Sequence, residues 1–345
     1  MRSPPPRLVR RLVLAPFVVV LSLVLIALSP VVLVGAVVVD VVSRSAWRLS
    51  RLTAFAAVYL IHEVVAILAL LVLWIASGFG LWMHAGWMEA AHYGFVRRWF
   101  RSLYLAAGAL LGLRIAGVEG PAPEPGPLLV FGRHGGIGNS LMYAGVLLTR
   151  YGRRPRIVML DLLQWDPVVD VLCHRMPSLF IDHDPSRSDG HVDAIARLAS
   201  GMGDLDAFVI FPEGHDFTPS LRERAIAHLR KKGRLPEAEL AENLTNVLPP
   251  RHRGAQAAMR AAPNADVAFV AHTVLEDVGT FTDVWRRLPL KEPIQACYWR
   301  VEADELPHGD EAVIDWLFQW WERIDTWIAE RKDDETLAHD RRGRS

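Results

Sequence analysis

Two long apolar stretches near the N-terminus limit what this 345-residue chain can fold into. Residues 12–39 contain no Asp, Glu, Lys or Arg, and residues 54–83 contain a single carboxylate, Glu63. A helix needs about 20 apolar residues to cross the hydrocarbon of a bilayer, and both stretches are longer. The first is also too long for a secretory signal, and no small-residue cleavage site is obvious after it. We therefore expect two N-terminal transmembrane helices, with Pro30 kinking the first or marking a re-entrant turn.

Basic residues suggest how these helices are oriented. A cluster that mixes arginines with aromatic residues follows the second stretch and is typical of an interfacial belt on the cytoplasmic side: Arg97, Arg98, Trp99, Phe100, Arg101 and Tyr104. A second cluster precedes the first stretch and comprises Arg2, Arg7, Arg10 and Arg11, so two spans place both clusters inside. The connector between the two stretches would then lie outside with Arg44, Arg48 and Arg51. This conflicts with the rule that basic residues are enriched on the cytoplasmic side. The sequence thus predicts a multi-pass membrane protein whose C-terminal domain lies on the cytoplasmic face.

The remainder of the chain alternates short apolar runs with helix-like segments. Strands are predicted at 156–160, 179–181, 207–211 and 267–271, and helices at 190–200 and 236–244. This alternation indicates an α/β fold with a largely parallel sheet flanked by helices. The apolar stripe of residues 312–328 predicts a helix that packs on the core or on a membrane surface.

Four segments follow from these patterns. Residues 1–11 form a disordered basic N-terminus, residues 12–102 a membrane anchor of two apolar helices and an interfacial segment, residues 103–330 the α/β domain, and residues 331–345 a charged, disordered tail.

The 38 basic residues balance the 38 acidic ones, so charge does not favour a nucleic-acid partner. Cys173 and Cys297 are too few for a disulfide framework. We predict no metal site.

Polar residues follow two of the predicted strands. The run Leu128–Phe131 stops at Gly132, and Arg133, His134 and a glycine-rich turn lead to Asn139. The second block, Phe211-Pro-Glu213-Gly214, comes directly after the strand predicted at 207–210. Open α/β sheets bind ligands beyond the carboxyl ends of their strands, so both blocks are candidate site segments. A neutral histidine is also the usual general base near pH 7.

These two blocks resemble motifs of the glycerolipid (lysophospholipid) acyltransferase family, whose first motif is H-x-x-x-x-D and whose third is F-P-E-G-T-R. Leu179-Phe-Ile-Asp182 is similar to the second motif, and Leu248-Pro-Pro-Arg251 with Gly254 is similar to a later L-P-x-R-x-x-G block. The resemblance covers about residues 103–327. It implies a 1-acylglycerol-3-phosphate acyltransferase-like enzyme that transfers a fatty acyl group from acyl-CoA or acyl-carrier protein to a lysophospholipid-like hydroxyl.

The resemblance also implies roles for individual residues. His134 would be the general base, and Asn139, at the position of the motif's Asp, would orient it. Glu213 and Gly214 would hold the acceptor. Because two positions at which the family supplies phosphate-binding cations carry none here, other arginines could substitute: Arg133, Arg187, Arg222, Arg224 or Arg251. Membrane lipids and the acyl donor are the implied partners, and no cofactor is needed beyond that co-substrate.

Three motifs depart from the family pattern. Asn139 replaces an Asp, His215-Asp216 replaces Thr-Arg, and His183 replaces the second motif's usual Arg. Asp216 is expected to repel a phosphate, so Asp216→Arg is expected to improve the use of lysophosphatidic acid. The departures leave open a non-catalytic relative that binds lipids or acyl chains. A hydrolase is disfavoured because the chain has no G-x-S-x-G motif.

Overall fold

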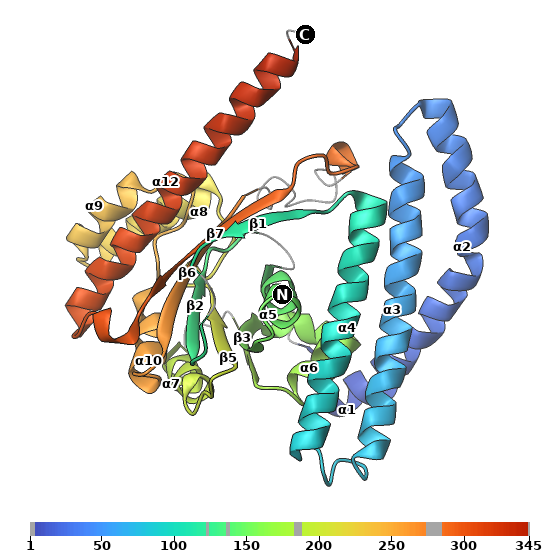
Figure 1. Cartoon of the computed structure of the whole chain (residues 1–345), viewed down its shortest axis with the longest axis horizontal. Coiled ribbons are helices and arrows are strands. Elements are labelled where there is room, and N and C mark those ends of the chain that lie inside the picture. The colour runs from blue at the N-terminus through green and yellow to red at the C-terminus, as the bar shows by residue number, and fades with distance from the viewer. Residues whose placement is uncertain (1–3, 122–123, 136–138, 183–187, 274–284, 344–345) are drawn as a thin grey trace. The chain divides into compact units, whose positions relative to one another are not determined.

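The computed structural model describes residues 4–121, 124–135, 139–182, 188–273 and 285–343 (Figure 1). The chain divides into two compact units. Unit 1 comprises residues 1–114, 142–185 and 281–293, and unit 2 comprises residues 115–141, 186–280 and 294–345. The boundary therefore differs from the division predicted at residue 102, because a large part of the α/β region belongs to the same unit as the N-terminal helices.

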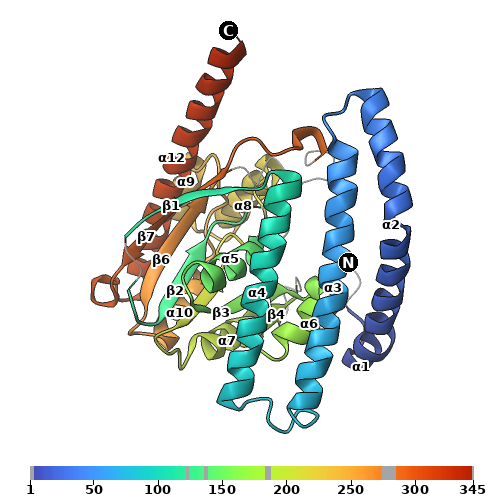
Figure 2. The same ribbon diagram turned by 45° about the vertical axis from the view of Figure 1, so that its right-hand side comes forward.

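Three long helices dominate unit 1: α2 (Ala15–Ser43), α3 (Arg48–Ala76) and α4 (Gly86–Leu111). They lie side by side in both views (Figures 1 and 2). Helices α2 and α3 are long and apolar enough to cross a membrane, as predicted. Pro30 lies inside an uninterrupted α2, so no re-entrant turn forms there. Helix α4 contains the predicted interfacial belt, but Trp99 Nε1 donates to His62 O on α3 at 3.2 Å, so this ring packs within the unit.

Arg7, Arg10 and Arg11 lie in helical structure, although residues 1–11 were predicted to be disordered. Helix α1 (Arg7–Val9) leads into a π-helical turn, η1 (Arg10–Leu14). Arg10 is buried, and its Nε and Nη2 donate to Asp170 Oδ1 at 3.0 and 2.7 Å. A buried guanidinium needs such a partner because an unpaired charge in a low-dielectric interior is costly. This ion pair ties the start of the chain to a segment 160 residues later.

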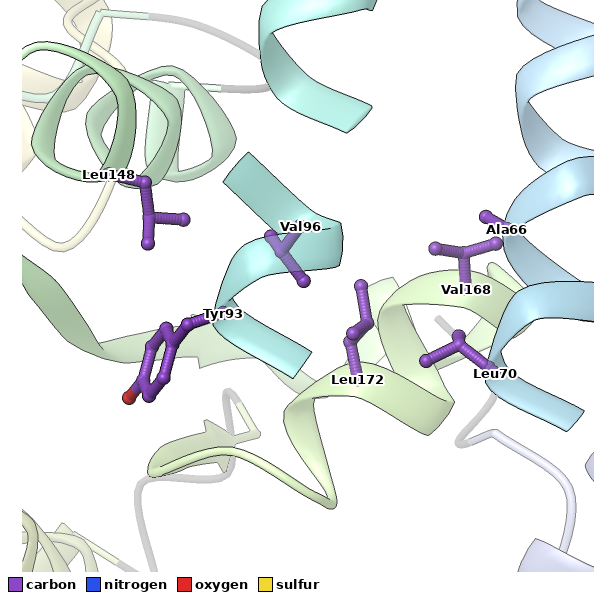
Figure 3. Packing of buried hydrophobic residues seen from close by; sticks show 7 residues of the cluster. All are labelled: Ala66, Leu70, Tyr93, Val96, Leu148, Val168 and Leu172. Carbon is purple, nitrogen blue, oxygen red and sulfur yellow. The ribbon is translucent and has the colours of Figure 1, made fainter. Parts of the chain in front are cut away.

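The rest of unit 1 is α/β in character. Strands β3 (Arg154–Leu160) and β4 (Ser178–Ile181) pair in parallel, joined through the 3-10 turn η2 (Asp161–Trp165) and helix α6 (Pro167–Cys173). Helix α5 (Asn139–Thr149) begins in unit 2 and continues into unit 1. A core cluster of unit 1 joins α5 and α6 to α3 and α4 (Figure 3). It contains Ala66, Leu70, Tyr93, Val96, Leu148, Val168 and Leu172.

The seven-stranded mixed sheet has the order β1–β7–β6–β2–β5–β3–β4, and unit 2 contains its first five strands. The strands are β1 (Ile115–Glu119), β2 (Leu128–Gly132), β5 (Asp206–Ile210), β6 (Asp266–His272) and β7 (Ile294–Val301). All neighbouring pairs among these five are parallel except β6 with β7. The predicted α/β class with a mostly parallel sheet is therefore confirmed, although the sequence patterns missed β1 and β7.

Helices flank the unit 2 sheet: α7 (Ser188–Ala199), α8 (Pro219–Lys231), α9 (Leu235–Asn243), α10 (His252–Ala261) and α12 (Asp310–Gly343), with the 3-10 turn η5 (Ala303–Glu305). Helix α12 packs its apolar stripe on β6, where Trp320 stacks on Phe269 with ring centroids 4.5 Å apart. The stripe is therefore a core face. The helix continues to Gly343, so the tail predicted as disordered from residue 331 is helical.

Candidate functional site

The candidate site lies in unit 2, where parallel strands β2, β5 and β6 end at one edge of the sheet. Arg133 N donates to Val270 O at 3.0 Å, which extends the pairing of β2 with β6 by one residue. His134 is the first residue beyond this pairing. The block Phe211–Gly214 leaves β5 at the same edge because β2 and β5 are parallel neighbours. The fold thus brings the two predicted motif blocks together.

Glu213 joins three of the sequence blocks through its buried carboxylate. Oε1 accepts the main-chain N–H of His134 at 2.9 Å, and Oε2 accepts that of Leu248 at 2.9 Å. The side chain is only 1% exposed. Burial raises the pKa of Glu213 to about 7, while nearby Arg133 and the two N–H donors oppose this rise. With both oxygens engaged inside the protein, Glu213 is placed to position His134 rather than to contact an acceptor as predicted.

The imidazole of His134 contacts a second carboxylate. Its Nδ1 lies within hydrogen-bond distance of Oδ1 of Asp216, and its ring meets Phe211 edge-on with centroids 5.1 Å apart. The His134 side chain is 20% exposed and that of Asp216 is about half exposed. A carboxylate oxygen only accepts hydrogen bonds, so Nδ1 carries the ring proton in this arrangement. Nε2 is then unprotonated and basic. This Nδ1–H tautomer is the one in which Nε2 can act as a general base.

Asn139 does not make the predicted hydrogen bond to His134. Its Nδ2 donates to Arg133 O at 2.8 Å, and its side chain is buried. Oδ1 is also buried and has no hydrogen-bond partner among the described residues. The amide therefore holds the main chain just before His134, at the start of α5, instead of the imidazole ring.

Arg133 points into the protein and not toward a substrate. Its side chain is fully buried, Nη1 donates to His272 O at 2.9 Å, and Nη2 donates to Asn246 O at 2.9 Å. The role predicted for Arg133 in substrate binding does not fit this placement. A guanidinium held by carbonyl oxygens is a structural cross-link, and its charge lowers the pKa of Glu213 against the effect of burial.

His272 is a site residue that the sequence patterns missed. It lies at the end of β6, is 1% exposed, and places Nε2 3.3 Å from Arg133 O. Burial lowers the pKa of His272 to about 3, and the charge of Arg133 adds to this effect, so the ring is neutral. A Cβ at Gly135 would lie 2.2 Å from Cε1 of this ring. His272 directly follows the strand predicted at 267–271, and a polar residue at that place was the feature of the sequence that could have identified it as a site residue.

Gly214, the last residue of the second block, lies beside Arg251 of the Leu248–Arg251 block. Gly214 has φ +71, and a Cβ there would lie 3.1 Å from Arg251 Cζ. Arg251 N donates to Pro212 O at 2.8 Å, which fixes its main chain beside the block. Within the described ranges its guanidinium makes no hydrogen bond or ion pair, so it remains available for an anion. Arg187 and His183 lie outside the described residues, as does the centre of the glycine-rich turn at 136–138.

Comparison of the chain with family models, curated proteins and solved structures found no match. In the part of the chain that the structure describes, no three His, Cys, Asp or Glu side chains are grouped to hold a metal ion.

Proposed function

We propose that this protein is a membrane-bound acyltransferase that moves a fatty acyl group from acyl-CoA or acyl-carrier protein to the hydroxyl of a lysophospholipid-like acceptor. One observation carries the proposal: two carboxylates from the same loop hold His134 at the carboxyl edge of the sheet. Glu213 Oε1 accepts the main-chain N–H of His134 at 2.9 Å, and Asp216 Oδ1 contacts Nδ1 of its imidazole ring. This combination fixes both the position and the tautomer of a general base, and His134 and Glu213 are residues that the motif resemblance singled out.

The reaction uses Nε2 of His134. As the acceptor oxygen attacks the thioester carbonyl, Nε2 takes its proton, and the new C–O bond forms in a tetrahedral intermediate. Collapse of this intermediate breaks the C–S bond, and the imidazolium returns the proton to the departing thiolate. The products are the ester and a free thiol, with no covalent enzyme intermediate. The carboxylate of Asp216 stabilises the positive charge that His134 carries between the two proton transfers.

Arg251 is the cation best placed to bind an anionic group of a substrate. Its guanidinium lies over Gly214, next to the loop that carries Glu213 and Asp216. Planar guanidinium groups bind phosphate through two oxygens, and both acyl-CoA and phospholipids contain phosphate. Arg133 takes no part in this binding because it is buried.

The contacts of α3 bear on how the protein meets the membrane. Near its start, Arg48 Nε donates to Leu288 O at 3.0 Å, and Tyr59 OH donates to Asp166 Oδ2 at 3.3 Å. Eleven residues of helix span about 16 Å, whereas the hydrocarbon core is about 30 Å thick. Further along α3, Arg175 Nη1 donates to Leu70 O at 2.7 Å. Residues 166, 175 and 288 belong to the α/β part of the chain, so α3 has no stretch between these contacts that is long enough to cross.

We therefore place the α2–α3 hairpin within one leaflet, instead of the two spans that the sequence predicts. Helix α2 exposes apolar side chains along its whole length, including Val20 (61%), Val31 (73%) and Val42 (80%). This face is the surface that contacts lipid. Such an arrangement holds the protein at the interface at which both lysophospholipids and acyl-CoA are accessible.

The test is a panel of lysophospholipid acceptors with labelled acyl-CoA and acyl-carrier protein as donors, using purified protein in detergent. We expect acceptor-dependent transfer of label into a phospholipid, with one thiol released per ester formed. Thiol release that does not depend on an acceptor would indicate hydrolysis. Tight binding of acyl chains without any transfer would favour the non-catalytic alternative.

A further inference from the structure

The loop after β5 holds Asp216 in a defined place. Gly214 N donates to Phe211 O at 3.0 Å, which closes a turn, and Arg251 N ties Pro212 O to the next block. Glu213 adds two hydrogen bonds from within the turn. Asp216, the residue that reaches His134 Nδ1, therefore follows two residues after an anchored turn, and this anchoring limits where its carboxylate can lie.

Position 139 is not equivalent to position 216 as a place for a carboxylate that orients His134. The Asn139 side chain is 2% exposed and directs its NH₂ at Arg133 O. A carboxylate at this position would face a carbonyl oxygen with no proton to share and would lose the only hydrogen bond that the amide makes to a described residue. Asn suits this place better than an ionised Asp, because the amide can donate to Arg133 O and a carboxylate cannot.

We propose that Asp216 is the positioning residue of the general base, and that Asn139 braces the main chain before His134. The carboxylate that orients the imidazole comes from the block after β5, and not from the helix that follows the glycine-rich turn. This inference rests on the proposed function for its meaning in catalysis, but the contact of Asp216 with Nδ1 can be tested separately. It also narrows the substrate class: a carboxylate beside His134 disfavours an acceptor that places a phosphate at this point.

The experiment compares Asp216→Ala, Asn139→Asp and the double variant with the exposed Asp315→Asn on α12 as control. Turnover is measured as thiol release with the best acceptor of the panel. ¹⁵N spectra of histidine-labelled protein report which ring nitrogen of His134 carries the proton, and the signal is assigned by its absence in His134→Gln. Asp216 is about half exposed, so its truncation leaves the fold intact, which thermal unfolding verifies.

We expect Asp216→Ala to lower kcat by about 10²-fold, within the range that general acid–base catalysis contributes. We also expect it to convert His134 from the Nδ1–H tautomer to a mixture. Asn139→Asp should lower kcat as well and should not restore Asp216→Ala. The proposal is overturned if Asp216→Ala keeps both kcat and the tautomer, or if Asn139→Asp raises kcat or rescues the double variant. If the unmodified protein transfers no acyl group, the tautomer measurement alone decides this inference, and only the proposed function fails.

Discussion

The carboxylate of Glu213 accepts the main-chain N–H of His134 at 2.9 Å, although 79 residues separate the two in the chain. This hydrogen bond, with its counterpart from Leu248 N, makes Glu213 the point at which three sequence blocks meet. A buried carboxylate is tolerated here because it accepts two N–H donors and lies near Arg133. The position of the candidate base thus depends on a residue that itself cannot reach a substrate.

Glu213→Gln should therefore destabilise the protein and impair turnover. The amide keeps one acceptor oxygen, but its NH₂ must face one of the two main-chain N–H groups, which leaves a buried donor unpaired. We expect the free energy of unfolding to fall by about 1–3 kcal/mol and kcat to fall with it. Denaturant unfolding in detergent measures the first effect. Glu223→Gln, an exposed substitution on α8, is the matched control, and equal behaviour of the two variants would contradict the assigned role.

Protein stability should depend on pH through His272. The folded-state pKa of His272 is lowered to about 3 by burial, below the ordinary value of 6.5. Its contribution to stability is thus fully present above pH 6.5 and is lost as the pH falls from 6.5 toward 3, because only the unfolded chain binds the proton there. The slope is at most about 1.4 kcal/mol per pH unit.

Thermal unfolding of the detergent-solubilised protein, followed by tryptophan fluorescence between pH 4 and 7, measures this dependence. The raised pKa of Glu213 acts in the opposite direction between about pH 4.5 and 7, so the effect of His272 is the difference between the wild-type and His272→Gln curves. His228→Gln, an exposed substitution on α8, should leave the wild-type curve unchanged. Parallel wild-type and His272→Gln curves would show that His272 does not carry the effect.

The membrane arrangement is tested with single cysteines in a variant that lacks Cys173 and Cys297. Ala46→Cys lies in the α2–α3 turn, and His84→Cys lies between α3 and α4. In sealed vesicles, a membrane-impermeant maleimide should label both from the same side, because the hairpin does not cross. Labelling of the two positions from opposite sides would restore the two-span arrangement predicted from the sequence.

Asp216→Arg separates the sequence-based expectation from the structural one. The resemblance predicts better use of lysophosphatidic acid, because an arginine would attract the phosphate. The structure predicts a fall in turnover on every acceptor, lysophosphatidic acid included, because a cation would replace the carboxylate beside His134 Nδ1. Acceptor-resolved kcat values distinguish the two. Improved kcat on lysophosphatidic acid would show that Asp216 matters for the head group and not for the base.

The sequence predicted the α/β class and the strands that carry the site because apolar runs bounded by glycine and polar residues mark buried parallel strands. It also predicted which blocks meet, since the carboxyl ends of parallel strands share one edge. Strand β1 escaped detection because Gly117 interrupts its short apolar pattern. Helix α10 escaped because its buried face consists largely of alanines.

The pairing of side chains could not be predicted in the same way. Whether Asn139 or Asp216 reaches His134 depends on the path of two loops, and sequence spacing does not determine that path. The same holds for Arg133: its long side chain can turn inward or outward, and here the carbonyl oxygens of His272 and Asn246 hold it inward.

Thiol release from acyl-CoA is the measurement that tests the central claim most directly. We predict that the wild-type protein releases thiol in proportion to acceptor acylated, that His134→Ala lowers this rate by at least about 10²-fold, and that His228→Ala retains it. Equal rates for His134→Ala and the wild-type protein, or no acceptor-dependent release from the wild-type protein, would contradict the account.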